Sequence, residues 1–225
     1  MSYYAIEFNA AGNGIGVHFY QEEPAEYPAN ELPCTEAQAQ TPMLWHNVNG
    51  VLTESLSAAQ TAQIALVTQG YNTATDYVPV TINGTTYQVD NTAGKQALNL
   101  SLAITANAML QAPAWVADTG YSAGAYCSVG GVILFCSTTG KSGTSAPTPP
   151  TTFGTPVTDG TAEWELLGRK VYLQGGSFVY MTPQQIMSAF QQGELYLHQM
   201  SAQLESVKAE INAATTVSAV QTFTF

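Results

Sequence analysis

The chain has 225 residues, 45% of them apolar, which is enough for one large or two small folded domains and excludes a chain disordered by composition. Its net charge of −11, with only five basic residues, excludes a basic patch for nucleic acid and attraction to an anionic membrane surface. Charged residues make up 9% of the chain against roughly 25% in ordinary domains, so the surface is mostly neutral, as in packed subunits, in particles that contact glycans, or simply in an unusual globular protein.

Residues 1–48 are predicted to be rich in β-structure. Two runs of alternating apolar residues flank a turn signal at 12–14 and predict a hairpin: Tyr4, Ile6 and Phe8, then Ile15, Val17 and Phe19. Four prolines and several glutamates follow in residues 21–44. This composition indicates an extended arm or linker that lies across a neighbouring subunit.

Two helices and a hairpin are predicted in the next part of the chain. Residues 53–69 have helical periodicity, with Thr53 or Ser55 as the N-cap and Gly70 at the C-terminal stop. Residues 78–90 alternate on both sides of Asn-Gly, which predicts a tight β-hairpin. A second helix is expected at about residues 93–111.

Residues 114–168 differ sharply in composition from what precedes them. They are rich in Gly, Thr, Ser and Pro and show no helical period. Short apolar runs at 125–129 and 132–136 flank Gly130-Gly131, which predicts another hairpin. We interpret this segment as a small all-β module inserted in the chain.

A long helix is predicted after a further hairpin at residues 172–181. Thr182, Pro183 and Gln185 form an N-terminal capping signal, and a heptad stripe follows. The stripe predicts an oligomer seam: Ile186, Phe190, Leu197, Met200, Leu204, Val207 and Ile211. The same stripe fits an intramolecular helical hairpin with residues 93–111. Residues 217–225 alternate again and predict a terminal strand that docks its aromatic side chains.

Two segments resemble protein families. The sequence of 78–111, joined to 172–225, has a hairpin ending in Tyr87-Gln88-Val89-Asp90, a helix, a Thr-Pro opening and a long helix ending in Ile-Asn-Ala-Ala-Thr-Thr. This series resembles a domain common in phage tail fibre and baseplate-associated proteins. The resemblance covers about 90 residues and implies a structural protein of the virion, usually threefold in tail fibres.

The inserted module has the second resemblance. Its spacing from Trp115 through Gly124 to the closing Val-Thr-Asp-Gly-Thr-x-x-Trp at 157–164 is similar to carbohydrate-binding modules of the chitin-binding type. Gly130-Gly131-Val132 and Cys127 depart from that pattern. The resemblance implies glycan binding, in which rings stack on sugars and polar groups take the hydroxyls. The candidates are Trp115, Tyr121, Tyr126, Asp159 and Trp164, with Phe153 a further ring. The same rings could instead form the small core of the module, and for Trp115 and Trp164 this core role is the favoured interpretation.

Signals for catalysis, metals and cofactors are absent from the sequence. The three histidines (His18, His46 and His198) have no metal-ligand spacing, and no nucleophile motif is present. Asp159, Glu163 and Glu165 form the one cluster of carboxylates that glycoside hydrolysis could use. The odd count of three cysteines argues against a disulfide framework, although Cys127 and Cys136 could face each other across a hairpin. No signal peptide or membrane-spanning run is seen, so synthesis in a reducing cytoplasm is expected.

Together these elements predict an α+β fold in three parts. The first part is a β-hairpin and arm for attachment to the tail, at residues 1–48. The second is a helical-β oligomerisation body with the long heptad helix, formed by residues 49–113 and 169–225. The third is the inserted all-β module, at residues 114–168. We expect a non-enzymatic component of a phage tail, made in the host cytoplasm and resident in the virion. Its expected partners are itself, as a homotrimer, other tail or baseplate proteins, and host polysaccharide. A host-polysaccharide adhesin and a tail fibre assembly chaperone that leaves the particle are the alternatives.

Overall fold

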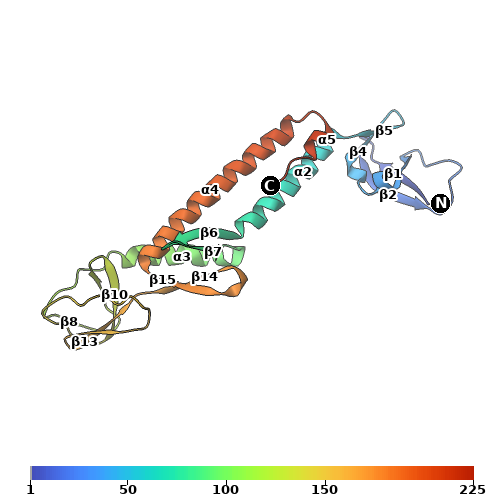
Figure 1. The fold of residues 1–225 in the computed structure, drawn as a ribbon. Helices are drawn as coiled ribbons and strands as arrows, with labels where there is room; N and C mark the ends of the chain where they lie inside the picture. The colour runs from blue at the N-terminus through green and yellow to red at the C-terminus, as the bar shows by residue number, and fades with distance from the viewer. Residues whose placement is uncertain (1) are drawn as a thin grey trace. The chain divides into compact units, whose positions relative to one another are not determined.

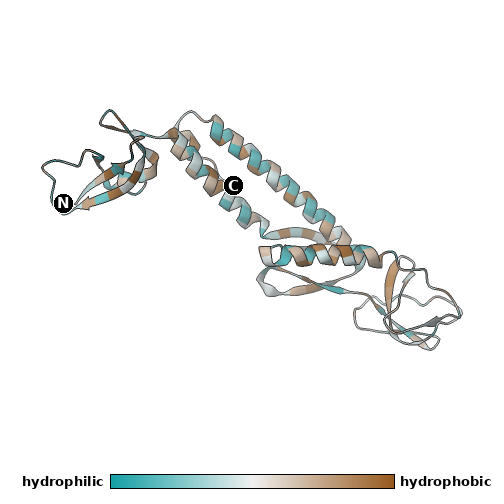
Figure 2. Ribbon diagram, turned by 180° about the vertical axis from the view of Figure 1, so that it is seen from behind, coloured by the Kyte–Doolittle hydropathy of each residue, from teal (hydrophilic) through white to brown (hydrophobic). Residues whose placement is uncertain are grey.

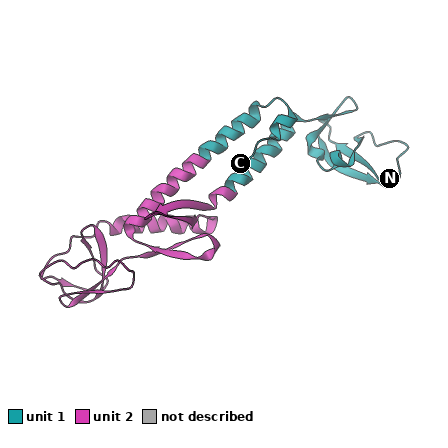
Figure 3. Ribbon diagram, viewed as in Figure 1, with its two compact units in different colours: residues 1–72, 201–225 teal, residues 73–200 magenta. Residues whose placement is uncertain are grey.

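The computed structural model describes residues 2–225, which combine helices with small antiparallel sheets, as the α+β class requires (Figure 1). Two compact units are present (Figure 3). Unit 1 holds residues 1–72 and 201–225, and unit 2 holds residues 73–200. These units do not coincide with the three predicted parts, because α2 (Leu56–Thr75) and α4 (Pro183–Ala213) each contribute to both.

Unit 1 begins with a three-stranded sheet in the order β2-β1-β3. The predicted hairpin is confirmed as β1 (Tyr3–Phe8) and β2 (Gly14–Tyr20). The prediction of an extended arm over residues 21–44 is wrong in its second half, because β3 (Glu31–Cys34) pairs with β1 and α1 (Glu36–Ala39) follows. An edge strand tolerates a proline without the loss of a ladder hydrogen bond, which is why the prolines of this segment misled the prediction.

A second hairpin follows in unit 1, formed by β4 (Trp45–Val48) and β5 (Val51–Glu54). Its two turn residues, Asn49 and Gly50, both have positive φ, as a tight primed turn requires. The predicted boundary between residues 48 and 49 falls inside this turn. A domain division there would separate two paired strands.

The helical part of unit 1 differs from the prediction at both of its ends. Ser55 is the N-cap of α2, since its Oγ accepts a hydrogen bond from the Ala58 amide, but the helix runs past Gly70 to Thr75. A Cβ at position 70 would lie 3.2 Å from the Cβ of Phe225, so this glycine permits close packing rather than ending the helix. The predicted terminal strand is wrong, because α5 (Val217–Val220) forms there under a Thr216 cap.

One hydrophobic cluster unites these elements of unit 1. Its central residues come from α2, from the second half of α4 and from α5, and are Ala59, Val67, Leu204, Ile211, Val217 and Val220. Phe223 and Phe225 pack against it, and Gln63 donates a hydrogen bond to the Phe223 carbonyl. The aromatic end of the chain therefore docks on its own helix.

The body of unit 2 is built from two hairpins and two helices. The predicted Asn-Gly hairpin is confirmed as β6 (Tyr77–Ile82) and β7 (Thr85–Asp90), and the predicted helix as α3 (Ala93–Met109). The second hairpin is β14 (Arg169–Tyr172) with β15 (Phe178–Met181). It leads into α4, where Thr182 and Gln185 form the predicted capping box.

The core of this body is assembled from all four elements. Its buried residues include Val80, Ala106, Val171, Met181 and Ile186. In Figure 2, α3 carries alternating hydrophobic and hydrophilic bands, whereas α4 is largely hydrophilic along its length. The buried core of the body lies where the two hairpins and α3 pack against the start of α4.

The inserted segment is all-β, as predicted, and lies between α3 and β14. Its main sheet has the order β12-β13-β10-β9, from β12 (Val157–Asp159), β13 (Ala162–Leu166), β10 (Val132–Thr138) and β9 (Tyr126–Val129). A small pair, β8 (Gly120–Tyr121) and β11 (Gly140–Lys141), completes it. Ile133 and Leu167 pack against Met109 at the end of α3, so the module is anchored to the body by apolar contact.

Candidate functional site

Four of the five predicted glycan-binding residues form a closed network inside the module. Asp159 is 5% exposed, and its Oδ2 accepts hydrogen bonds from the indole N–H groups of Trp115, at 2.8 Å, and Trp164, at 3.0 Å. Its Oδ1 accepts from the Gly143 amide at 2.8 Å. Every polar atom of the two indoles and both carboxylate oxygens are thus engaged within the module.

The aromatic part of this network is centred on a buried ring, with Trp115 and Tyr121 partly buried around it. Trp164 is 0% exposed, and the Tyr121 ring meets it edge-on with centroids 4.8 Å apart. The Tyr121 hydroxyl accepts a hydrogen bond from the Val116 amide at 2.8 Å. These contacts correspond to the core role that the sequence left open for the tryptophans, and they extend it to Tyr121 and Asp159.

The thiols of Cys127 and Cys136 belong to the same core and are free. They do not form the disulfide that the hairpin could have allowed. Burial, together with the nearby Asp159 charge, raises the pKa of the Cys127 thiol to about 12. Burial also raises the pKa of Cys136, whose Sγ donates to the Thr138 carbonyl. Both groups are inert packing residues at neutral pH.

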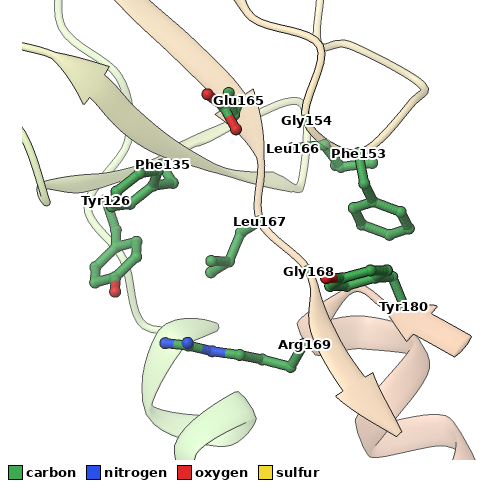
Figure 4. Close-up of a pocket in the computed structure, with 10 residues that line it drawn as sticks. All are labelled: Tyr126, Phe135, Phe153, Gly154, Glu165, Leu166, Leu167, Gly168, Arg169 and Tyr180. Atoms are coloured by element: carbon green, nitrogen blue, oxygen red, sulfur yellow. The ribbon is translucent and has the colours of Figure 1, made fainter. Parts of the chain in front are cut away.

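The opposite face of the sheet carries a different set of side chains. Tyr126, Phe135 and Glu165 are paired across β9, β10 and β13, so they form one row on this face. Their sequence neighbours point to the buried face, because side chains alternate along a strand. The row forms one wall of a cleft of about 400 Å³ (Figure 4).

The second wall of this aromatic cleft comes from a loop of the module and from the β14–β15 hairpin. The rings of Phe153 and Tyr180 lie 5.7 Å apart, and Figure 4 shows them across the cleft from Tyr126 and Phe135, with Leu167 between. Gly168 makes this wall possible, since a Cβ there would lie 2.5 Å from a ring carbon of Phe153.

Two charged side chains stand at the ends of the aromatic cleft. Glu165 and Arg169 flank Leu167 on one extended segment, at alternate positions, and Figure 4 places them on opposite sides of the leucine. Among the described residues, neither forms an ion pair or a side-chain hydrogen bond. The cleft therefore offers one carboxylate acceptor and one guanidinium donor group beside partly exposed rings.

The aromatic surface continues from the cleft onto β15. Phe178 and Tyr180 are 48% and 42% exposed, and their rings lie 5.7 Å apart. The Lys170 ammonium group sits over the Phe178 ring at 4.4 Å. Phe153, Tyr180 and Phe178 thus form a continuous ridge of rings along one edge of the cleft.

A separate polar cluster lies on the N-terminal sheet in unit 1. The Glu31 carboxylate is 5% exposed; it is 2.5 Å from His18 Nδ1 and accepts a hydrogen bond from the Tyr20 hydroxyl at 2.6 Å. This hydrogen bond raises the pKa of Tyr20 to about 12. The partners come from β2 and β3 on either side of β1, so the cluster ties the sheet together.

Five of the seven predicted seam residues on α4 contribute to two cores of the chain itself: Ile186 and Leu197 to one, and Leu204, Val207 and Ile211 to the other. Ile186, Leu204 and Ile211 are buried deepest, at 4%, 6% and 0% exposure. Ile186 packs with Ala106 of α3, as in the intramolecular alternative left open by the sequence. The other four are partly buried: Phe190, Leu197, Met200 and Val207.

Neither a metal site nor a membrane span is found in residues 2–225. No group of three or more His, Cys, Asp or Glu side chains in this range could hold a metal ion, and none of its helices is long and apolar enough to cross a bilayer. Comparison with models of known protein families, with curated proteins and with solved structures found no match to this chain.

The aromatic cleft was only partly visible in the sequence. Tyr126 and Phe153 were among the predicted rings, and Glu165 was noted only as a member of a carboxylate cluster. Phe135, Arg169 and Tyr180 were missed. The available signal was strand alternation: Tyr126 next to Cys127, and Glu165 next to Trp164, place one member of each pair on the open face.

Proposed function

We propose that this chain is a structural, non-enzymatic component of a phage tail, a tail fibre or baseplate-associated protein, that contributes to assembly and to contact with the host surface. The observation that carries the proposal is the inserted module between α3 and β14, which has its own core and opens an aromatic cleft to solvent. A display surface of this kind suits attachment. The residue patterns that resemble tail fibre proteins and carbohydrate-binding modules point the same way.

The arrangement of carboxylates supports a role without catalysis. Glycoside hydrolysis needs two carboxyl groups on either side of the scissile bond. Asp159 is buried and holds two indoles and an amide, and Glu163 accepts a hydrogen bond from Thr138 at 2.6 Å. Glu165 is left in the aromatic cleft without a second free carboxylate among its lining residues.

Self-association, as a homotrimer, belongs to the proposal. Leu204 and Ile211 of the heptad stripe already face the chain's own core, so contacts between copies need other residues. α3 offers them: Leu100 and Ile104 are 51% and 63% exposed one turn apart, on a helix whose one charged residue is Lys95. In a chain of net charge −11, such a face is where copies meet with least repulsion.

Light scattering on the purified protein at neutral pH tests self-association. We expect a mass three times the 23.9 kDa of the chain, and a return to 23.9 kDa in Ile104→Glu. Ile211→Ala serves as the matched control: it loses about 3 kcal/mol of stability because its side chain is fully buried, and it keeps the oligomer mass. A monomeric wild-type protein would refute the trimer.

Mass spectrometry of purified phage particles from a producing strain tests the location. A structural tail component is expected in particles in a fixed ratio to other tail proteins. The alternative, a tail fibre assembly chaperone, predicts the chain in the lysate and its absence from particles. The inserted module favours the first outcome, because a chaperone has no use for a display surface.

A further inference from the structure

The aromatic cleft of unit 2 combines partly exposed rings with side-chain polar groups that have no partner among residues 2–225. Tyr126, Phe135, Phe153 and Tyr180 present rings to a volume of about 400 Å³, within the usual range of small-molecule sites. Rings of this kind stack against the apolar faces of planar or ring-shaped ligands. The floor between them, Leu167, is 6% exposed and apolar.

The unpartnered polar groups of the cleft include both hydrogen-bond donors and hydrogen-bond acceptors. Among residues 2–225, the hydroxyls of Tyr126 and Tyr180, the Glu165 carboxylate and the Arg169 guanidinium make no side-chain hydrogen bond or ion pair. Together they supply acceptors, donors and two groups that can do both. A ligand rich in hydroxyls can satisfy all of these groups at once.

We propose that the aromatic cleft binds a neutral oligosaccharide, a site that deepens and rests on the proposed contact with a host surface. A wholly apolar ligand would desolvate Glu165 and Arg169 without replacing their hydrogen bonds, which is costly. An acidic ligand that fills the cleft would be attracted by Arg169 at one end but repelled by Glu165 at the other, in a chain of net charge −11. A neutral sugar replaces the hydrogen bonds of Glu165 and Arg169 through its hydroxyls and is not repelled by the carboxylate.

The ridge of rings at the edge of the aromatic cleft points to a chain of sugars rather than a single one. Phe153, Tyr180 and Phe178 follow one another at 5.7 Å between centroids. Tyr180 is common to the cleft and the ridge, so a sugar unit in the cleft can be followed by further units along β15. Lys170, held over Phe178, adds a donor at the outer end.

Isothermal titration calorimetry with the purified full chain tests the proposal. The probes are chitohexaose, cellohexaose and maltohexaose as neutral hexamers, and a hexamer of galacturonic acid as the acidic one. We expect at least one neutral hexamer to bind and the acidic hexamer to bind at least about tenfold more weakly. Binding to no neutral hexamer, or preference for the acidic one, overturns the proposal.

Cleft variants locate the site. Phe153→Ala and Tyr180→Ala are expected to weaken binding about tenfold each, because each removes a stacking ring. Glu165→Gln and Arg169→Gln are expected to weaken it similarly. Tyr180→Phe, which removes only a hydroxyl and keeps the fold, should lose about threefold.

Phe19→Ala is the matched control, since Phe19 is an aromatic residue of unit 1 that is 57% exposed and lies outside the cleft. It should bind the hexamer as the wild type does. Equal binding by the wild type and Tyr180→Ala overturns the assignment of the site. Absence of sugar binding in a chain that is found in phage particles refutes the cleft proposal alone, whereas sugar binding by a chain absent from particles refutes the tail location alone.

Discussion

The two faces of the β12-β13-β10-β9 sheet carry similar aromatic residues in opposite circumstances. On one face, Asp159 engages the indoles of Trp115 and Trp164, and no polar atom of the three is left over. On the other face, Tyr126 lines a cleft whose polar side chains have no hydrogen-bond or ion-pair partner among residues 2–225. Ring content alone does not separate a core from a binding surface; the satisfaction of the neighbouring hydrogen-bonding groups does.

The largest effect is expected from disrupting the Asp159 network on the face of the sheet that carries Trp164, here called the closed face; the face that carries Tyr126 is called the open face. Asp159→Asn replaces an acceptor oxygen with an amide group, so at least one buried N–H donor loses its partner, at a cost of about 3 kcal/mol. Urea unfolding followed by tryptophan fluorescence measures this loss. Asp118→Asn is the control, because Asp118 is an exposed partner of Lys141 and its loss should cost about 0.5 kcal/mol or less. Equal stability of the two variants would contradict the network.

Removing one hydroxyl group from each face of the sheet, at Tyr121 and at Tyr126, compares the two faces directly. Tyr121→Phe removes a hydroxyl that accepts a hydrogen bond from Val116 and should cost about 1 kcal/mol. Tyr126→Phe removes a hydroxyl that has no hydrogen-bond partner among residues 2–225 and should change stability by less than about 0.5 kcal/mol. Thermal unfolding of both variants in parallel is the measurement. If Tyr126→Phe were the more destabilised, the open face would be structural after all.

Gly168→Ala alters the open face without removing any ring or charge. The added methyl meets the Phe153 ring at 2.5 Å, and because that ring is partly exposed it can turn away. Stability should fall by less than about 1 kcal/mol, whereas affinity for the neutral hexamer should fall about threefold. Calorimetry on the variant, beside the wild type, measures both. Unchanged affinity would show that Phe153 is not part of the site.

The smallest effect concerns the thiols of the closed face. With the Cys127 pKa raised to about 12, only about one molecule in ten thousand carries that thiolate at pH 8. A water-soluble disulfide reagent should therefore modify Cys34, which is half-buried, and spare Cys127 and Cys136 until urea is added. Rapid labelling of all three thiols in the native protein would argue against the buried core.

The raised pKa of Cys127 also sets the direction of a pH dependence. The folded-state pKa lies above the ordinary value of 9.0, so the folded protein prefers the protonated thiol. The corresponding stability is present below pH 9 and is lost as the pH rises toward 12. Urea midpoints from pH 7 to 10 should decline at the upper end, and a Cys127→Ala variant should show less of this decline.

Local signals in the sequence predicted the elements whose structure is decided locally. Asn83-Gly84 adopts positive φ at both positions, and Thr182 with Gln185 caps α4, as the residues indicate. Gly70 and α5 were mispredicted because their conformations depend on distant partners. Gly70 lies under Phe225, and the buried Val217 and Val220 favour one helical turn over a strand.

The aromatic cleft could not be predicted from local sequence signals either. Tyr126, Phe153 and Tyr180 come from three separate segments that only the fold brings together. The closing motif at residues 157–164 was visible in the sequence, but Asp159 and Trp164 within it proved to be interior. A motif can identify a module through the residues that hold it together, and these need not be the residues that touch a ligand.

The period of two along the strands keeps the two faces of this sheet independent of each other. Tyr126, Phe135 and Glu165 alternate with Cys127, Leu134, Cys136 and Trp164, and the register is fixed by the Gly130-Gly131 turn between β9 and β10. Substitutions at position 165 can therefore accumulate during evolution, or be randomised in a library, without altering the Trp164 core, whereas Tyr126 and Phe135 also pack against the Met109, Ile133 and Leu167 cluster and tolerate fewer replacements. The module has the layout of a scaffold on which recognition can diversify without refolding.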